Sequence, residues 1–375
     1  MKYIVCPDSF KESMSAVEVT QVIEKAILKF DPDAEVVKLP LSDGGEGYVQ
    51  AVAIATEGAL QRVQVKDALM KPTVAEYLLL DGGKTAILEL AQASGLEKIS
   101  RELRDPLKAS SFGTGEMILH ALESGVDKIV IGLGGSATND GGMGLLQALG
   151  VKFYDENGCE LTGCGENLEK IKQMDISNLD KRLKKVELIA ATDVENRVLG
   201  VNGATYVYGR QKGATHEVCQ RLEKGMLHFV SKVKEYCQVD ISNAIGGGAA
   251  GGVGAVLIGI LKAKRVSGIE WLLEKVNFQE VCKGAEWIVT GEGRIDAQTF
   301  QGKVVAGVLN TTNNSSAQLI LLAGLVTQEA RHYEGERVKM VQITPEGECL
   351  ESALKNGKAN LSRAVESVLL EIKLK

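Results

Sequence analysis

The chain has 375 residues, 45% of them hydrophobic and 25% charged, with a formal net charge of −6. This composition fits a globular protein of two or three domains and excludes a basic nucleic-acid-binding surface. The sequence starts without a signal-peptide pattern, and no apolar run is long enough to span a membrane. The seven cysteines have no disulfide-like spacing, so we expect a cytoplasmic protein without nucleic-acid or membrane partners.

The first elements along the chain alternate between strand and helix. Residues 2–6 form an apolar run typical of a buried strand, and residues 17–30 carry apolar side chains at helical spacing. Residues 35–39 predict a second strand, which is followed by a helix over residues 48–55. Strands that alternate with helices indicate a parallel sheet with right-handed crossovers.

The middle of the chain follows a different pattern. Residues 62–65, 73–80 and 85–90 predict strands joined by short turns, and the Asp-Gly-Gly turn between the last two indicates a hairpin. Residues 128–131 and 151–154 then predict the two strands of a βαβ-like stretch. Antiparallel strands do not continue the crossover pattern, so we expect a second domain in this part of the chain.

The last third returns to the alternating pattern, with strands predicted at residues 287–290, 318–323 and 338–343. With the two N-terminal strands, they predict one doubly wound parallel sheet assembled from both ends of the chain. We therefore expect an α/β fold with two domains, formed by residues 1–59 and 285–375 (parallel sheet) and residues 60–284 (inserted, mixed α/β). The two connections between such domains suit opening and closing around a ligand.

Acidic and glycine-rich segments follow several of the predicted strands. Ligands of open parallel sheets bind beyond the carboxyl ends of the strands, so these segments are candidates for the site. Asp8, Ser9 and Lys11 follow the first strand and combine an acid with a cation. Asp43 and Glu46 follow the second strand among glycines, and their carboxylates can bind Mg²⁺ or hydroxyl groups. The alternatives are a helix cap for the first segment and an exposed turn for the second.

The densest glycine-rich segment, residues 132–142, follows a predicted strand and precedes a predicted helix. Consecutive N–H groups at a helix N-terminus can bind phosphate oxygens. Gly132, Gly134 and Ala137 also match half of a dinucleotide fingerprint, with Asp155 at the position of a ribose-binding acid. The alternative function is therefore a nicotinamide-dependent oxidoreductase acting on a small hydroxy acid.

Later segments add further candidates. Asp193 follows an apolar strand and is a candidate general base, and Lys212 is either functional or a solvated side chain. Glu292, Arg294 and Asp296 form the most charged predicted loop of the last third. Arg294 can bind a carboxylate or phosphate through two N–H groups, and the two acids can bind Mg²⁺ or a hydroxyl group. The sequence has neither a P-loop nor protein-kinase motifs, which excludes those two classes.

Taken together, these segments resemble the motifs of the bacterial type 1 glycerate kinases (glycerate 2-kinases). The similar segments occur in the family's order, at residues 7–11, 43–47, 112–116, 131–142, 211–215 and 290–296. The resemblance covers essentially the whole chain and implies phosphorylation of D-glycerate by ATP with Mg²⁺. The expected product is 2-phosphoglycerate, in glyoxylate or aldarate breakdown. The implied fold is a flavodoxin-like domain with an inserted restriction-enzyme-like domain. The candidate segments are divided between the two predicted domains, so we expect the active site in the cleft between them. A homo-oligomer is compatible with the sequence.

Our mechanistic hypothesis for phosphoryl transfer gives the candidate residues the following roles. The ATP phosphates would contact Gly134, Gly135, Ser136, Ala137, Thr138 and Lys212. Lys11 and Arg294 would hold the glycerate carboxylate or the transferring phosphoryl group. Asp193 would be the catalytic base, with Asp8 as the second choice, and Asp193 and Asp296 would bind Mg²⁺. The glycerate contacts would come from Ser9, Asp43, Glu46, Glu292 and Asp296.

Overall fold

The computed structural model describes residues 1–297, 299–300 and 303–373, and its backbone divides into two compact units. Unit 1 comprises Met1–Asp43, Gln50–Thr56 and Ser267–Lys375, and unit 2 comprises Gly44–Val49 and Glu57–Val266. The chain therefore passes between the units three times within residues 43–57 and once more after Val266.

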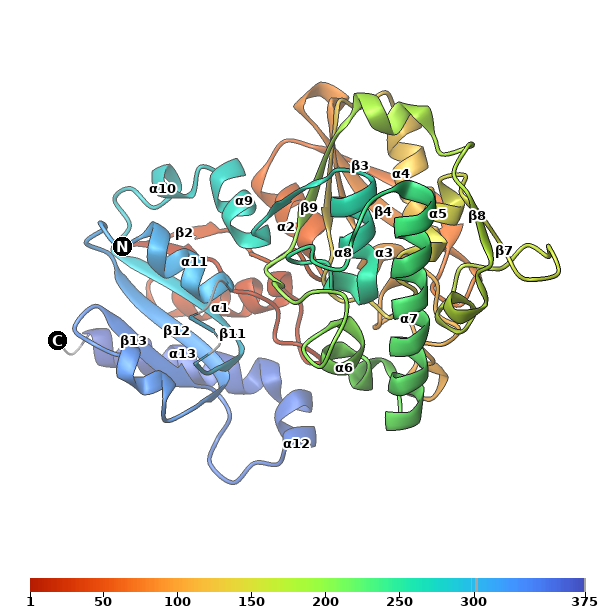
Figure 1. The fold of residues 1–375 in the computed structure, drawn as a ribbon. Coiled ribbons are helices and arrows are strands. Elements are labelled where there is room, and N and C mark those ends of the chain that lie inside the picture. The colour runs from red at the N-terminus through yellow and green to blue at the C-terminus, as the bar shows by residue number, and fades with distance from the viewer. Residues whose placement is uncertain (298, 301–302, 374–375) are drawn as a thin grey trace. The chain divides into compact units, whose positions relative to one another are not determined.

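Unit 1 contains a five-stranded sheet in which every pairing is parallel (Figure 1). Its strands are β1 (Lys2–Val5), β2 (Glu35–Lys38), β11 (Trp287–Ile295), β12 (Gln318–Val326) and β13 (Val338–Gln342). The spatial order β13-β12-β11-β1-β2 is one of the two common orders of doubly wound sheets. The prediction of one parallel sheet built from both ends of the chain is confirmed.

Helices cover both faces of this sheet, because its central strands are apolar on both sides. A capping box opens α1 (Ala16–Phe30), which packs with α13 (Gly357–Lys373) on the face that carries Ile320. α11 (Val304–Thr311) packs on the opposite face, which carries Leu321. The other helices with residues in unit 1 are α2 (Tyr48–Ala55), α9 (Gly268–Lys275), α10 (Phe278–Val281) and α12 (Leu350–Lys355).

β11 is longer than the strand predicted at residues 287–290. Its pairing with β12 continues as far as Ile295, with Glu292 opposite Ala323 and Arg294 opposite Leu325. The prediction of a loop at residues 291–296 is therefore wrong for all but its last residue. The physical reason is that β12 offers its backbone groups along the same length, and paired backbone groups are more stable than unpaired ones.

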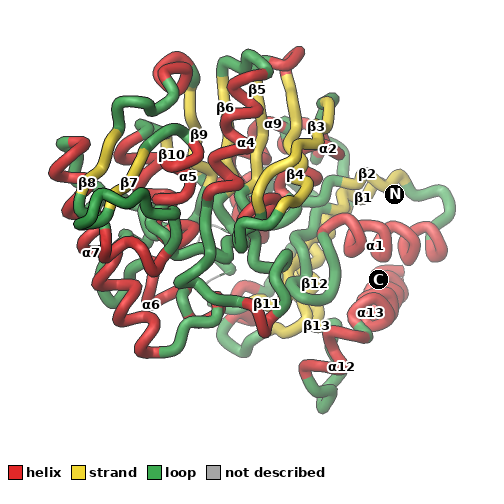
Figure 2. Tube along the Cα trace, turned by 90° about the vertical axis from the view of Figure 1, so that its right-hand side faces the viewer, coloured by secondary structure: helices red, strands yellow, loops and turns green. Residues whose placement is uncertain are grey.

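Unit 2 contains a six-stranded mixed sheet in the order β10-β9-β6-β5-β4-β3 (Figure 2). Its strands are β3 (Ala59–Lys66), β4 (Pro72–Leu80), β5 (Thr85–Glu89), β6 (Lys128–Gly132), β9 (Glu187–Ala191) and β10 (Lys264–Val266). β3, β4 and β5 pair antiparallel, and β5, β6, β9 and β10 pair parallel. The predicted hairpin between β4 and β5 is confirmed.

The helices of unit 2 are α3 (Ala91–Ser94), α4 (Phe112–Glu123), α5 (Met143–Ala148), α6 (Ala204–Tyr208), α7 (His216–Cys237) and α8 (Val253–Ala255). All of them except α6 contribute buried residues to one apolar core that they share with the sheet. Met117 of α4, Leu145 of α5 and Phe229 of α7 are all fully buried in that core. The helices thereby fix the segments that connect the strand ends.

The predicted βαβ-like stretch is wrong. β7 (Lys152–Tyr154) pairs antiparallel with β8 (Gln173–Asp175) in a separate two-stranded sheet and does not join β6. Asp155 accepts hydrogen bonds from the amides of Asn157 and Cys159 at 2.9 and 2.8 Å, as in a tight turn. The dinucleotide interpretation needs this acid on a parallel strand next to β6, so it loses its structural basis.

No helix in the described part of the chain is both long enough and apolar enough to cross a membrane.

Candidate active site

Acidic side chains gather in unit 1 where β1, β2 and β11 approach their carboxyl ends. The Asp8 amide, just beyond β1, donates to the carbonyl of Gly291 at 2.8 Å. Burial of the Asp8 side chain, and then the charge of Asp43, raise its pKa well above the usual range. Glu292 raises this pKa further and Lys11 lowers it. The structure thus brings together four of the residues predicted for the site.

A tight turn carries Ser9 and Lys11. The Ser9 amide donates to Oδ1 of Asp8 at 2.6 Å. Phe10 and Met14 exchange two backbone hydrogen bonds of 2.8 and 2.9 Å, which close the turn. The backbone of this turn is therefore fixed, while the Lys11 side chain is exposed.

Glu292 and Arg294 lie on the same face of β11, because alternate residues of a strand share a face. The Glu292 side chain is 12% exposed, and burial raises its pKa although Lys303 lies 3.9 Å from Oε2. Its buried Oε1 has no hydrogen-bond partner among the described residues. Such an oxygen fits a cation or a hydroxyl-bearing ligand. Arg294 is exposed, and its Nε donates to Oδ2 of Asp296 at 3.1 Å.

Backbone contacts anchor the glycine loop (residues 132–142) of unit 2. The amide of Gly134 donates to the carbonyl of Gly44 at 3.0 Å, and the amide of Ala137 to the carbonyl of Ser94 at 2.9 Å. A Cβ added to Gly134 would lie 2.3 Å from the Cα of Gly45. Only glycine allows two backbones to approach so closely.

Three amides of the glycine loop have no such partner. The N–H groups of Gly135, Ser136 and Thr138 donate to no acceptor in the part of the chain that the structure describes. Gly135 is exposed, whereas the Thr138 hydroxyl is buried and donates to the carbonyl of Ala250 at 3.2 Å. Closely spaced amides of this kind can bind the oxygens of a phosphate group.

Lys212 lies beneath the glycine loop and is only 2% exposed. Its Nζ donates to Oγ of Ser136 at 2.9 Å and to the carbonyl of Thr138 at 2.7 Å. Burial lowers its pKa to about 7, although the nearby Asp140 favours the charged form. Through these two hydrogen bonds, Lys212, which was predicted as an ATP ligand, supports the loop from inside the protein.

The N-terminus of α5 is not an open phosphate site. Asp140 is fully buried and accepts from the amides of Gly142 and Gly144 at 3.1 and 3.2 Å. It also accepts from the amide and hydroxyl of Ser111 at 2.8 and 2.7 Å. The expectation that the glycine loop offers the amides of its following helix is therefore wrong, because Asp140 already occupies them.

The acidic loop (residues 43–47) leads into α2, and Glu46 is its most exposed acid. Tyr48 follows the loop and is fully buried. Burial, and then the negative charge of Asp193, raise the pKa of Tyr48 well above its usual range. Asp193 itself lies just beyond β9 and is half-buried. Unit 2 thus brings Asp193 close to the start of α2.

Sequence reasoning missed Glu89, the last residue of β5, which is 1% exposed. Its Oε1 accepts from the amide of Gly47 at 3.1 Å and its Oε2 from the amide of Val49 at 3.2 Å. Burial raises the pKa of Glu89 to about 7, and these amides oppose the shift. The sequence did contain a signal for Glu89, because it stands at the end of an apolar strand, and the same kind of position made Asp193 a candidate.

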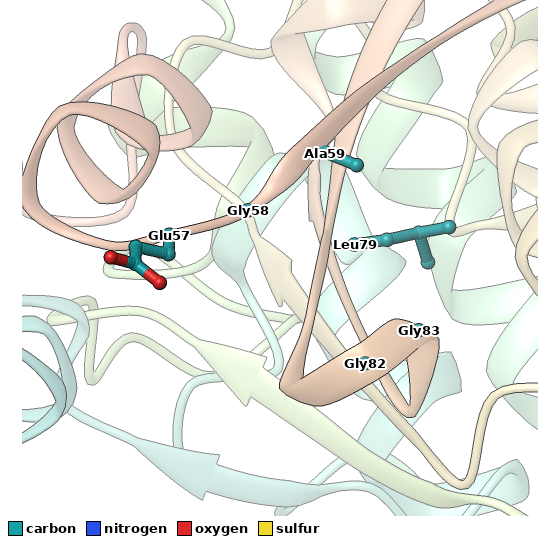
Figure 3. A pocket seen from close by; sticks show the side chains of 6 residues that line it. All are labelled: Glu57, Gly58, Ala59, Leu79, Gly82 and Gly83. Carbon is teal, nitrogen blue, oxygen red and sulfur yellow. The ribbon is translucent and has the colours of Figure 1, made fainter.

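Among the described residues, no group of three or more His, Cys, Asp or Glu side chains is arranged to hold a metal ion. The predicted Mg²⁺ ligands Asp193 and Asp296 belong to unit 2 and unit 1, respectively. A surface pocket of unit 2 contains none of the predicted site residues (Figure 3). It is lined by Glu57, Gly58, Ala59, Leu79, Gly82 and Gly83.

Comparisons with known proteins agree over nearly the full length. The model of the family described as "Glycerate kinase family" matches residues 3–373. A protein of Escherichia coli K12 named glycerate 2-kinase is 42% identical over 370 residues, covering 98% of this chain and 97% of the relative. A glycerate kinase of Halalkalibacterium halodurans is 40% identical over 367 residues, covering 97% of this chain and 96% of the relative. A crystal structure from Salmonella typhimurium LT2, assigned as a glycerate kinase 2, has a TM-score of 0.80 at 42% identity and covers 100% of this chain and 98% of that one.

Proposed function

The chain belongs to the glycerate kinase family, and we propose that it transfers the γ-phosphoryl group of ATP to D-glycerate. Use of ATP follows from membership of a kinase family. The product we propose is 2-phosphoglycerate, because the relative in E. coli, 42% identical, is named glycerate 2-kinase.

The observation that carries the proposal is the row of unpartnered amides in the glycine loop. Gly135, Ser136 and Thr138 can donate to the phosphate oxygens of ATP. Gly134 and Ala137 contribute by anchoring the loop, and Lys212 supports it from below. Phosphoryl transfer depends mainly on such positioning and on charge stabilisation, with little covalent chemistry for the protein to perform.

The charged cluster of unit 1 supports a role with the acceptor and with Mg²⁺. Lys11 and Arg294 are cations that can bind the carboxylate of glycerate or the transferring phosphoryl group. The unpartnered Oε1 of Glu292 and the neighbouring Asp43 are hard oxygen donors of the kind that Mg²⁺ prefers. When bound, Mg²⁺ would neutralise charge on the phosphates. Asp296 is a weaker candidate ligand, since its Oδ2 accepts from Arg294.

Smaller roles follow for the remaining predicted residues. Ser9 and Glu46 are proposed to bind the hydroxyl groups of glycerate, since both can accept hydrogen bonds. Asp193 is proposed as the base that takes the proton of the reacting hydroxyl, and Asp8 is the second candidate. The half-buried position of Asp193 beside Tyr48 supports a fixed side chain. The strand order of unit 1 supports a flavodoxin-like assignment of that unit.

An assay for ADP release with D-glycerate, ATP and Mg²⁺ tests the proposal. We expect release that requires all three components and no turnover of a nicotinamide cofactor. Adding enolase to the product then separates the isomers, because that enzyme consumes 2-phosphoglycerate directly and 3-phosphoglycerate only after isomerisation. The absence of glycerate-dependent ADP release would refute the kinase proposal. Hydride transfer to NAD⁺ would restore the oxidoreductase alternative.

A further inference from the structure

Glu46 lies in a stretch of backbone that cannot fix its own conformation. Gly44 and Gly47 have φ values of 94° and 79°. Glycine reaches this region without strain but also leaves it easily, so it specifies no single conformation. The Glu46 side chain is exposed. Contacts that hold the backbone on either side of Glu46 therefore help to set its position.

The contacts that fix the backbone before Glu46 come from the glycine loop. The Gly44 carbonyl accepts from the amide of Gly134 at 3.0 Å. The close approach of Gly134 to Gly45 leaves this part of the acidic loop little freedom to move. Gly134 itself follows β6, whose last residue is Gly132.

The hydrogen bonds that fix the backbone after Glu46 come from Glu89. Its two carboxylate oxygens accept from Gly47 and Val49, residues that precede it by 42 and 40 positions. The amide of Tyr48 also favours the ionised form of Glu89. The first turn of α2 has no acidic residue of its own, so above about pH 7 the ionised Glu89 supplies the negative charge that a helix N-terminus favours.

Both sets of contacts come from the same edge of the six-stranded sheet. Glu89 pairs with Gly132 at the ends of the neighbouring parallel strands β5 and β6. The glycine loop and the Glu89 carboxylate therefore start from the same edge of the six-stranded sheet. They meet the acidic loop before and after Glu46. A carboxylate suits this place because both of its oxygens accept, whereas a glutamine would turn its NH₂ group towards amide donors.

We propose that Glu89 is a positioning residue for phosphoryl transfer, which sets where Glu46 lies against the substrate. The inference rests on the proposed function, because its readout is kinase activity. Glu89 does not need to contact either substrate for this role. A residue that only stabilises the fold would change the fraction of folded enzyme and leave the kinetics of the folded fraction unaltered.

A double-mutant cycle with Glu89→Gln, Glu46→Gln and the double variant tests the proposal. Steady-state kinetics give kcat and KM for both substrates, and urea unfolding gives the folded fraction by which kcat is corrected. We expect each single variant to lower kcat/KM for glycerate by roughly 10-fold or more, with KM for ATP within about 2-fold. The kcat/KM of the double variant should be no more than about 3-fold below that of the less active single variant, because both changes disturb the same interaction.

Two further variants complete the design. Glu57→Gln removes an exposed acid elsewhere in unit 2 and should leave kcat and both KM values unaltered. Glu89→Asp keeps both acceptor oxygens and should recover part of the activity that Glu89→Gln loses. It also serves as the folded variant if the glutamine variant is unfolded. A wild type without ADP release overturns the proposed function. An active wild type whose double variant shows the product of the two single losses overturns only the role of Glu89.

Discussion

Replacement of Gly134 by alanine tests whether the close contact between the glycine loop and the acidic loop matters for catalysis. The added Cβ would lie 2.3 Å from the Cα of Gly45, 2.9 Å from its N and 3.4 Å from the carbonyl oxygen of Gly44. Ordinary contact begins at 3.4 Å, so the two backbones must separate by at least about 1.1 Å at the tightest point, the difference of 3.4 and 2.3. Because the φ of Gly134 is not in the left-handed region, alanine adds this displacement without backbone strain.

The expected cost can be estimated from that displacement. Overpacking of a well-packed site typically costs about 1–3 kcal/mol of stability, which leaves most proteins folded. A displacement of about 1 Å between groups that position a substrate can lower kcat/KM by roughly 100-fold. We therefore expect a folded enzyme with a large kinetic defect. The loss should exceed what the change in unfolding free energy explains.

Kinetics of ADP release and urea unfolding measure the two quantities in the same preparations. Gly335→Ala is the matched control, because nothing lies within 4 Å of its added Cβ and its φ is not positive. It should match the wild type in both measurements. If Gly134→Ala is folded and its kcat/KM stays within about 2-fold of the wild type, the contact does not position substrate and the reasoning is refuted.

Three other predictions concern ionisable groups. Asp193→Asn should lower kcat by about 100-fold or more with little change in ATP binding, and a larger loss in Asp8→Asn than in Asp193→Asn would make Asp8 the base. A phosphate bound near Lys212 should raise the pKa of this lysine from about 7, so ATP binding at pH 8 should be accompanied by proton uptake. Calorimetry in buffers of different ionisation enthalpy measures this uptake, and Lys212→Met should abolish it. Glu89 has a pKa of about 7 in the folded protein, against 4.5 for an unperturbed glutamate, so the folded state keeps a proton that the unfolded chain loses between these two values. Stability should therefore fall as the pH rises from 4.5 to 7. The fall is on the order of 3 kcal/mol in urea unfolding, and a Glu89→Gln variant with the same slope would contradict the assignment.

The alternating elements of the fold could be predicted because buried parallel strands have a clear signature. The runs at β1 and β12 are mainly apolar, and β13 has three apolar residues among its five, so their place in one sheet followed from pattern alone. The end of β11 could not be predicted, because glycine and charged residues are typical of loops and only pairing with β12 makes them a strand. The βαβ-like prediction for β7 was wrong for a related reason, since the sequence of a short strand does not show with which strand it pairs.

The candidate site shows the same division between pattern and contact. The acids beyond β1 and β9 could be found from their position after apolar runs. The structural role of Asp140 could not be predicted, because it depends on a hydrogen bond from Ser111, which lies 29 residues earlier in the chain. Glu89 likewise gains its role from amides about 40 residues away. Long-range hydrogen bonds of this kind leave no trace in local sequence.

The split of unit 1 between the two ends of the chain sets an order of events during synthesis. The Thr290 hydroxyl of β11 donates to the carbonyl of Cys6, 284 residues away. At about 5–20 residues per second, ribosomes need roughly 15–60 s to produce that separation. During this interval β1 can pair with β2 but not with its other neighbour, β11, whereas the continuous segment Glu57–Val266 of unit 2 has already emerged. We expect unit 2 to fold first on the ribosome and the apolar N-terminal strands to be the part of the nascent chain that chaperones protect.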